Sequence, residues 1–270
     1  MQRLQISGVD LAVEIQGQGQ PLIFVHGFPL DHTMWEAQIA EFSRDYHVLA
    51  PDLRGFGASD TGSGIATMER FADDLAELAD CLSLTARGIV LCGLSMGGYI
   101  AFQFLRKYAA LLRGLVLCNT RATADSDEVR ENRYRLATKV RQEGPDAVVH
   151  QMLPKLVSDE TRRERPECLD RLETMMRGAS REGIAAAALG MAERPDSSAL
   201  LSSLPCPALV IAGEFDALSP SSEMQAMANA IPGVRFEVIP GAGHMTPMEK
   251  PREFNAILRS FLQSLEPRST

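Results

Sequence analysis

Short runs of apolar residues alternate along this chain with longer amphipathic stretches. The runs are rich in aliphatic and β-branched side chains and end at Gly, Pro, Asn or Asp, where a chain can turn. They predict strands at residues 11–15, 22–25, 47–50, 89–92, 115–118, 209–212 and 235–239. The stretches between them carry apolar residues at the helical period and predict helices at residues 68–82, 97–108, 221–230 and 253–265. This alternation indicates an α/β fold with a largely parallel sheet covered on both faces, whose first two strands form an antiparallel meander at one edge.

Residues 121–200 interrupt this rhythm. They contain no convincing strand, and 29 of these 80 residues are charged, 14 basic and 15 acidic. Helical patterns separated by prolines occupy residues 129–142, 146–153, 167–178 and 184–192. The segment is either a solvated helical decoration or a cap inserted between two halves of a sheet. Because the strand pattern resumes at residue 209, we expect a core of residues 1–120 and 201–270 and a helical cap of residues 121–200.

Composition narrows the classes of protein and partner. The 270 residues carry 35 acidic and 27 basic side chains, a net charge of −8, which argues against nucleic acid as a partner. No apolar run is long enough for a membrane span, the first residues do not resemble a signal peptide, and the five cysteines form no Cys-x-x-Cys pair. We therefore expect a cytoplasmic protein with reduced thiols. Phosphate-loop, zinc-helix and dinucleotide motifs are absent from the sequence, so no cofactor or metal is expected. The sequence does not indicate an oligomeric state.

The strongest chemical signal is Gly-Leu-Ser-Met-Gly at residues 93–97, between a predicted strand and a predicted helix. This context is typical of a nucleophile elbow, in which a strained turn exposes the serine hydroxyl and the following helix points its N-terminus towards it. Ser95 is therefore the candidate nucleophile, and a structural turn serine is the alternative. The Met96 amide is one candidate donor to an oxyanion. The Phe28 amide, in the loop after the strand at 22–25, is the other.

A serine nucleophile needs a base and a carboxylate that orients the base. Among the five histidines, His244 lies on a glycine-rich turn just after the last predicted strand, which favours it over His26, His32, His47 and His150. Asp216 follows the strand at 209–212 and is the candidate acid. Glu214 is its nearest rival but more naturally shapes the turn, and Asp52 more naturally holds its own loop. The resulting order Ser95, Asp216, His244 is the one expected on an α/β sheet.

Four motifs resemble the α/β-hydrolase fold superfamily: His-Gly-Phe-Pro at 26–29, Asp-Leu-Arg-Gly-Phe-Gly-Ala-Ser at 52–59, Gly-Leu-Ser-Met-Gly-Gly at 93–98 and Gly-Ala-Gly-His-Met at 241–245. The similarity extends over essentially the whole chain, and residues 121–200 match the usual cap position. Within the superfamily, the chain resembles the branch of 3-oxoadipate enol-lactonases, small carboxylesterases and cofactor-free haloperoxidases. The resemblance implies a mostly parallel eight-stranded sheet flanked by helices.

Residue types and resemblance together predict a serine hydrolase that cleaves a small carboxylic ester or lactone through an acyl-enzyme. Enol-lactonase, C–C bond hydrolase and perhydrolase activities remain alternatives that use the same triad, and a small-molecule receptor on this scaffold is the non-enzyme alternative. Candidate walls of the substrate pocket, each of which also suits plain core packing, are Trp35, Met152, Leu153 and Leu189, beside Phe28 and Met96.

Overall fold

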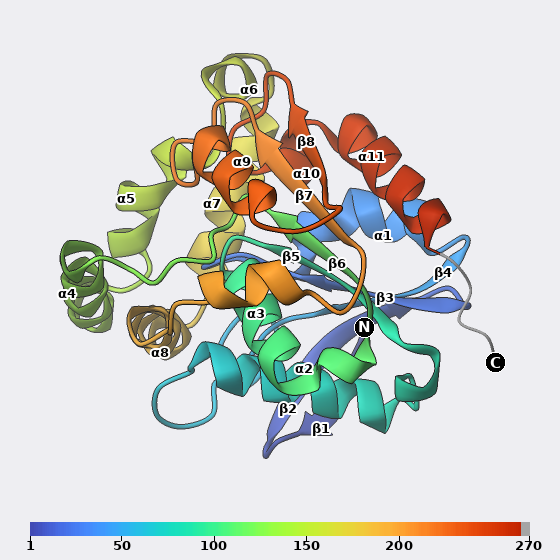
Figure 1. The fold of residues 1–270 in the computed structure, drawn as a ribbon. Coiled ribbons are helices and arrows are strands. Elements are labelled where there is room, and N and C mark those ends of the chain that lie inside the picture. Colours follow the sequence, from blue (N-terminus) through green and yellow to red (C-terminus); the bar gives the residue numbers. More distant parts are fainter. Residues whose placement is uncertain (266–270) are drawn as a thin grey trace.

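A single mixed sheet organises residues 1–265, the part of the chain that the computed structural model describes. Its eight strands follow the order β1-β2-β4-β3-β5-β6-β7-β8 (Figure 1). The pairs β1–β2 and β2–β4 are antiparallel, and every other neighbouring pair is parallel. The strands are β1 (Gln2–Ile6), β2 (Val9–Gln16), β3 (Gln20–Val25), β4 (Tyr46–Pro51), β5 (Ile89–Leu94), β6 (Leu112–Cys118), β7 (Ala208–Gly213) and β8 (Arg235–Ile239). The expected parallel α/β sheet is confirmed.

The antiparallel edge differs from the sequence-based expectation. The first two predicted strands are β2 and β3, and they do not pair with each other because β4 lies between them. The antiparallel hairpin is instead formed by β1 and β2, joined through Ser7 and Gly8, both at positive φ. The apolar pattern missed β1 because most of its side chains are polar and exposed.

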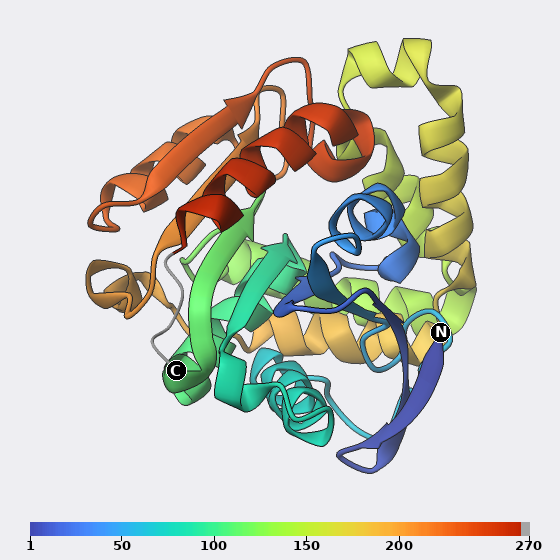
Figure 2. The same ribbon diagram turned by 90° about the vertical axis from the view of Figure 1, so that its right-hand side faces the viewer.

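Helices cover both faces of the sheet. Figure 2 shows α1 (Glu36–Phe42) and α11 (Pro251–Ser264) on one face and α2 (Met68–Cys81) and α3 (Met96–Tyr108) on the other. Two shorter helices, α9 (Ser221–Asn229) and α10 (Thr246–Glu249), follow β7 and β8. The 3₁₀ turns are η1 (His32–Trp35), η2 (Thr85–Arg87), η3 (Ala109–Leu111) and η4 (Ser198–Ser203). No helix within residues 1–265 is both long enough and apolar enough to span a bilayer.

Five consecutive helices lie between β6 and β7 (Figure 1). They are α4 (Asp127–Glu143), α5 (Asp146–Leu156), α6 (Asp159–Glu164), α7 (Pro166–Gly178) and α8 (Arg181–Ala192). The four helices expected here are present. The pattern missed α6, which is six residues long with only one buried side chain. Hydrogen bonds tie α8 to the loop after β4, from Ser180 Oγ to the Gly55 carbonyl (3.0 Å) and from the Ala66 amide to the Ala186 carbonyl (3.2 Å).

Candidate active site

Ser95 occupies a strained turn between β5 and α3. Its φ of 56° and ψ of −113° lie in a region that residues with a side chain rarely adopt. Two hydrogen bonds hold the turn against the end of β6: the Ser95 amide donates to the Cys118 carbonyl (2.9 Å), and Thr120 Oγ1 donates to the Ser95 carbonyl (2.8 Å). The surrounding structure therefore stabilises the strained backbone of Ser95.

The glycines on either side of Ser95 allow this turn to form. A Cβ on Gly93 would lie 2.3 Å from the Gly97 carbonyl oxygen, and a Cβ on Gly97 would lie 2.3 Å from the Val25 carbonyl oxygen. Backbone cannot move aside as a flexible side chain does, so both positions require glycine. The strand–turn–helix context expected of a nucleophile elbow is present.

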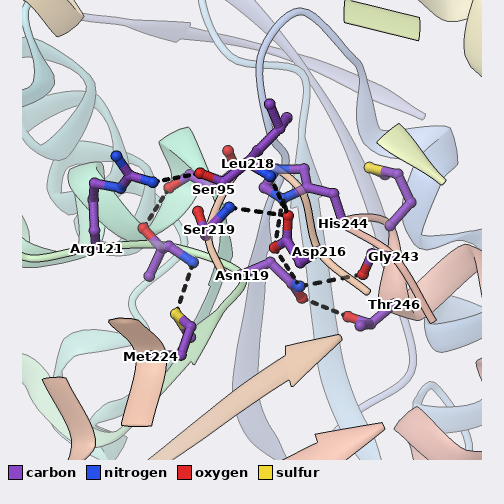
Figure 3. A network of polar contacts seen from close by, with 12 residues as sticks. Ser95, Asn119, Arg121, Asp216, Leu218, Ser219, Met224, Gly243, His244 and Thr246 are labelled. Atoms are coloured by element: carbon purple, nitrogen blue, oxygen red, sulfur yellow. Dashed lines mark hydrogen bonds and ion pairs between the residues drawn. The ribbon is translucent and has the colours of Figure 1, made fainter. Parts of the chain in front are cut away.

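Asp216 and His244 form a buried pair at the same edge of the sheet (Figure 3). The His244 Nδ1 atom lies 2.9 Å from Asp216 Oδ2 and 3.0 Å from Oδ1, and the residues are 2% and 5% exposed. Asp216 Oδ1 also accepts hydrogen bonds from the amides of Leu218 (2.8 Å) and Ser219 (3.0 Å). Burial raises the pKa of Asp216, but the charge and hydrogen bond of His244, with the other donors, outweigh burial and lower the pKa overall. Asp216 is therefore held as a carboxylate that fixes the orientation of the ring.

Asn119 is a third member of this network and was not among the residues expected from the sequence. Its Nδ2 donates to Asp216 Oδ2 (2.9 Å) and to the Gly243 carbonyl (3.4 Å), and its Oδ1 accepts from Thr246 Oγ1 (2.8 Å) (Figure 3). Asn119 thus links the end of β6 to the loops that carry Asp216 and His244. The sequence signal for this role was an asparagine directly after a buried strand. Asn119 has a φ of 47°, and asparagine adopts positive φ more readily than most residues.

Glu249 is a second residue that the sequence reasoning missed. It is 2% exposed. Its Oε1 accepts from the amides of Gly243 (2.9 Å) and Met245 (3.0 Å), the two neighbours of His244. Its Oε2 accepts from the amide of Ser158, between α5 and α6, and from Thr161 Oγ1 in α6, both at 2.8 Å. One carboxylate therefore holds the histidine loop and the inserted helices together.

The carboxyl ends of β5, β7 and β8 bring Ser95, Asp216 and His244 to one edge of the sheet, connected through the end of β6. Within residues 1–265, no hydrogen bond joins the Ser95 hydroxyl to the His244 ring, and Nε2 of that ring has no hydrogen-bond partner. Such bonds are often loose in free enzymes and tighten around a substrate. Nε2 is thus available to accept a proton.

The two candidate oxyanion donors have amides without a protein acceptor in the described part of the chain. Met96 is the first residue of α3, so its N–H has no acceptor within the helix. Phe28 lies in the loop after β3 and lines the same cavity as Ser95. Both N–H groups remain available to a ligand.

A cavity of about 330 Å³ opens over Ser95. Core residues such as Phe28 line it together with side chains of α4, α5 and α8. Of the expected pocket walls, Met152 lines the cavity, whereas Leu153 and Leu189 are partly buried against the core and are not among its lining residues.

Trp35 does not have the position in the pocket wall that the sequence analysis expected. It is fully buried, stacks on Phe24 with ring centroids 4.9 Å apart and packs against Phe254. It does not line the cavity over Ser95. The side chain is a core residue of the α1 face, where a large aromatic ring buries much apolar surface.

The rival carboxylates have structural contacts of their own. Glu214 accepts from the Gly241 amide (2.9 Å), and Asp52 accepts from the His32 ring (2.7 Å) and the Ala58 amide (2.8 Å).

One group of potential metal ligands occurs in residues 1–265. It consists of Asp31, His32 and Asp52, whose ligand atoms lie within 4.8 Å of one another, and hydrogen bonds within the protein already engage these side chains. A larger cavity of about 940 Å³ lies beside this group and contains none of the candidate catalytic residues.

Comparisons with known proteins agree with the fold and with the branch expected from the motifs. The model of the alpha/beta hydrolase fold family matches residues 20–251. Among solved structures, a thermophilic esterase from Thermogutta terrifontis with malate bound is 52% identical, with a TM-score of 0.96 over 98% of this chain and 99% of that one. The enol-lactonase from Burkholderia xenovorans is 28% identical, with a TM-score of 0.90 over 97% and 100% of the two chains. The 3-oxoadipate enol-lactonase 1 of Acinetobacter baylyi is 26% identical over 261 residues, 96% of this chain and 95% of the relative. With its fold, its elbow and this similarity over nearly the whole chain, the protein belongs to the alpha/beta hydrolase fold family, in the branch that includes enol-lactonases and esterases.

Proposed function

We propose that this hydrolase cleaves small carboxylic esters or lactones, with Ser95 as nucleophile, His244 as general base and Asp216 as the acid that orients the ring. The observation that carries the proposal is the buried Asp216–His244 pair at the sheet edge where Ser95 sits on its strained turn. A buried carboxylate that accepts a hydrogen bond from Nδ1 leaves the opposite nitrogen of the ring free to take a proton.

In the first half of the reaction, the Ser95 oxygen attacks the substrate carbonyl while its proton passes to His244 Nε2. The carbonyl oxygen becomes a tetrahedral oxyanion, which the amides of Phe28 and Met96 stabilise. Collapse of this intermediate breaks the bond to the leaving oxygen, which takes the proton from His244. The product is an acyl-enzyme and a free alcohol, or a tethered alcohol when the substrate is a lactone.

In the second half, His244 removes a proton from water, whose oxygen attacks the acyl carbon. The second tetrahedral intermediate uses the same two amides, and its collapse returns the proton to Ser95 and releases the acid. Atoms balance with water as the only co-substrate, so the reaction as written uses no cofactor. Asp216 keeps its negative charge throughout and stabilises the imidazolium that forms twice in each cycle.

The inserted helices support a small substrate. Side chains of α4, α5 and α8 complete the walls of a cavity of about 330 Å³, near the lower end of the range for ligand pockets. We assign residues 121–200 as a cap on a core of residues 1–120 and 201–270. The names of the relatives, esterase and enol-lactonase, favour ester and lactone carbonyls over other bonds that the same three groups cleave.

The test compares Ser95→Ala with Ser63→Ala, which changes an exposed serine outside the cavity. With short-chain 4-nitrophenyl esters, kcat/KM should fall about 10⁴-fold or more in Ser95→Ala and stay within twofold of wild type in Ser63→Ala. A fluorophosphonate probe should label every form except Ser95→Ala, and circular dichroism should show that both variants are folded. Labelling or turnover that survives in Ser95→Ala would exclude Ser95 as the nucleophile, and absence of labelling in the wild type would favour a receptor.

A further inference from the structure

The wall of the cavity over Ser95 is positively charged although the protein as a whole is acidic. Its charged lining residues are Arg121, Arg133, Lys155 and Asp125. Three cations and one carboxylate therefore face this space in a chain whose net charge is −8. A charge excess opposite to that of the whole molecule concentrates ions of one sign in a cavity.

Three of these four charged lining residues have a partner of opposite charge. Asp125, with its side chain 2% exposed, pairs with Arg133 and, at 2.7 Å, with the buried Arg194. Burial raises the pKa of Asp125, but the two arginines outweigh burial and lower it overall, so this carboxylate is ionised. Arg121 pairs at 3.1 Å with Glu223, which does not line the cavity.

Lys155 has no partner of opposite charge within the described residues. Within residues 1–265 its ammonium group makes no ion pair and no hydrogen bond, in contrast to Lys107, Lys139 and Lys250, each of which pairs with a carboxylate. Lys155 is an exposed residue on α5, one helical turn after Gln151, which lines the same cavity. An exposed lysine on a helix is ordinarily only a solvated surface charge. This one lines the small space into which Ser95 also faces.

We propose that this cavity selects esters that carry a negative charge next to the scissile carbonyl, and that Lys155 is the specificity-determining residue. The inference rests on the proposed function and adds the substrate class. In a space of about 330 Å³, a short substrate with its carbonyl at Ser95 would hold a second carboxylate near the lining cations. The attraction between opposite charges is stronger there than in bulk water because the walls partly exclude solvent.

The experiment uses two methyl esters of matched shape, monomethyl succinate and methyl 4-methylpentanoate, which differ by a carboxylate in place of an isopropyl group. Methanol release gives kcat/KM for wild type, Lys155→Met and Lys139→Met. The control removes one positive charge from an exposed lysine of α4 outside the cavity, so both variants have the same net charge. We expect wild type to prefer the anionic ester, and Lys155→Met to lower that preference five- to tenfold, mainly through KM. Lys139→Met should leave it within twofold of wild type.

Ionic strength supplies a second readout, because added salt should lower kcat/KM for the anionic ester and leave kcat/KM for the neutral ester unchanged. Equal loss on both esters in Lys155→Met, or equal effects of the two lysine variants, would overturn the proposal and leave the proposed hydrolase function intact. Calorimetry of monomethyl succinate with Ser95→Ala and with Ser95→Ala/Lys155→Met separates binding from chemistry. If wild type cleaves neither ester, the calorimetry still tests the anion site. Five- to tenfold weaker binding of monomethyl succinate in the double variant supports the site, and unchanged affinity excludes it.

Discussion

Replacing Asn119 with Asp would place a second carboxylate against Asp216. In the present structure Asn119 Nδ2 lies 2.9 Å from Asp216 Oδ2, so the substitution exchanges a hydrogen-bond donor for a like charge at contact distance. With charge centres roughly 4 Å apart and an effective dielectric constant of about 20, ionising both groups costs about 4 kcal/mol. The folded variant should therefore retain a shared proton that the unfolded chain releases at the ordinary carboxyl pH.

The sign of the pH dependence follows from that proton. Because the folded pair binds it more tightly than the unfolded chain, the variant loses stability as pH rises, over roughly three pH units above the ordinary carboxyl range. Urea unfolding of wild type and Asn119→Asp at pH 4.5, 5.5, 6.5 and 7.5 measures this deficit, which should grow by about 3 kcal/mol over that range because part of it is already present at pH 4.5. Asn119→Leu removes the donor without adding charge, so its deficit should vary little with pH. A deficit in Asn119→Asp that is constant across this range would refute the electrostatic reasoning.

Three further substitutions test other parts of the structure. Gly97→Ala should destabilise the protein by about 1–3 kcal/mol in thermal or urea unfolding, because the new Cβ meets backbone, whereas Gly178→Ala, with nothing within 4 Å, should be close to neutral. Glu249→Gln turns an amide N–H₂ towards groups that donate to the carboxylate, so stability should fall by about 1–3 kcal/mol and kcat/KM should fall with it; unchanged kinetics would contradict its role in holding the histidine loop. His32→Gln tests a pKa that the hydrogen bond to Asp52 raises. The wild-type advantage in Tm should be full at pH 5.5 and should shrink towards pH 8.5, as the folded protein loses that proton, and an advantage that grows instead would reverse the sign.

The central strands were the clearest to predict from sequence. They are buried on both faces and read as continuous aliphatic runs, as β5 and β6 do. The edge strand β1 could not be predicted in this way because water accepts its polar side chains. The order of the strands in the sheet was harder to predict than their presence. β2 and β3 are consecutive in sequence, but nothing in their composition indicates that β4 lies between them.

Some features of the candidate site could be predicted from sequence and others could not. The strained turn at Ser95 was predictable because such a turn needs glycines at fixed spacing, which is a local property of the sequence. Asn119 and Glu249 were not predictable, because their partners Asp216 and Ser158 are 97 and 91 positions away along the chain. Trp35 shows the opposite error, since an aromatic residue near a candidate loop has the same signature in a pocket and in a core.

The two oxygens of Glu249 make the histidine loop and the α5–α6 junction one mechanical unit. Any ligand that pushes α5 outward pulls on the carboxylate that fixes the residues on either side of His244. Accommodation of a bulkier ligand and the placement of the His244 ring are therefore linked through these contacts and through the Met245 amide, which donates to the Leu156 carbonyl at the end of α5 (3.0 Å). Redesign of the substrate range is best directed at α4, while the contacts of Ser158 and Thr161 are kept.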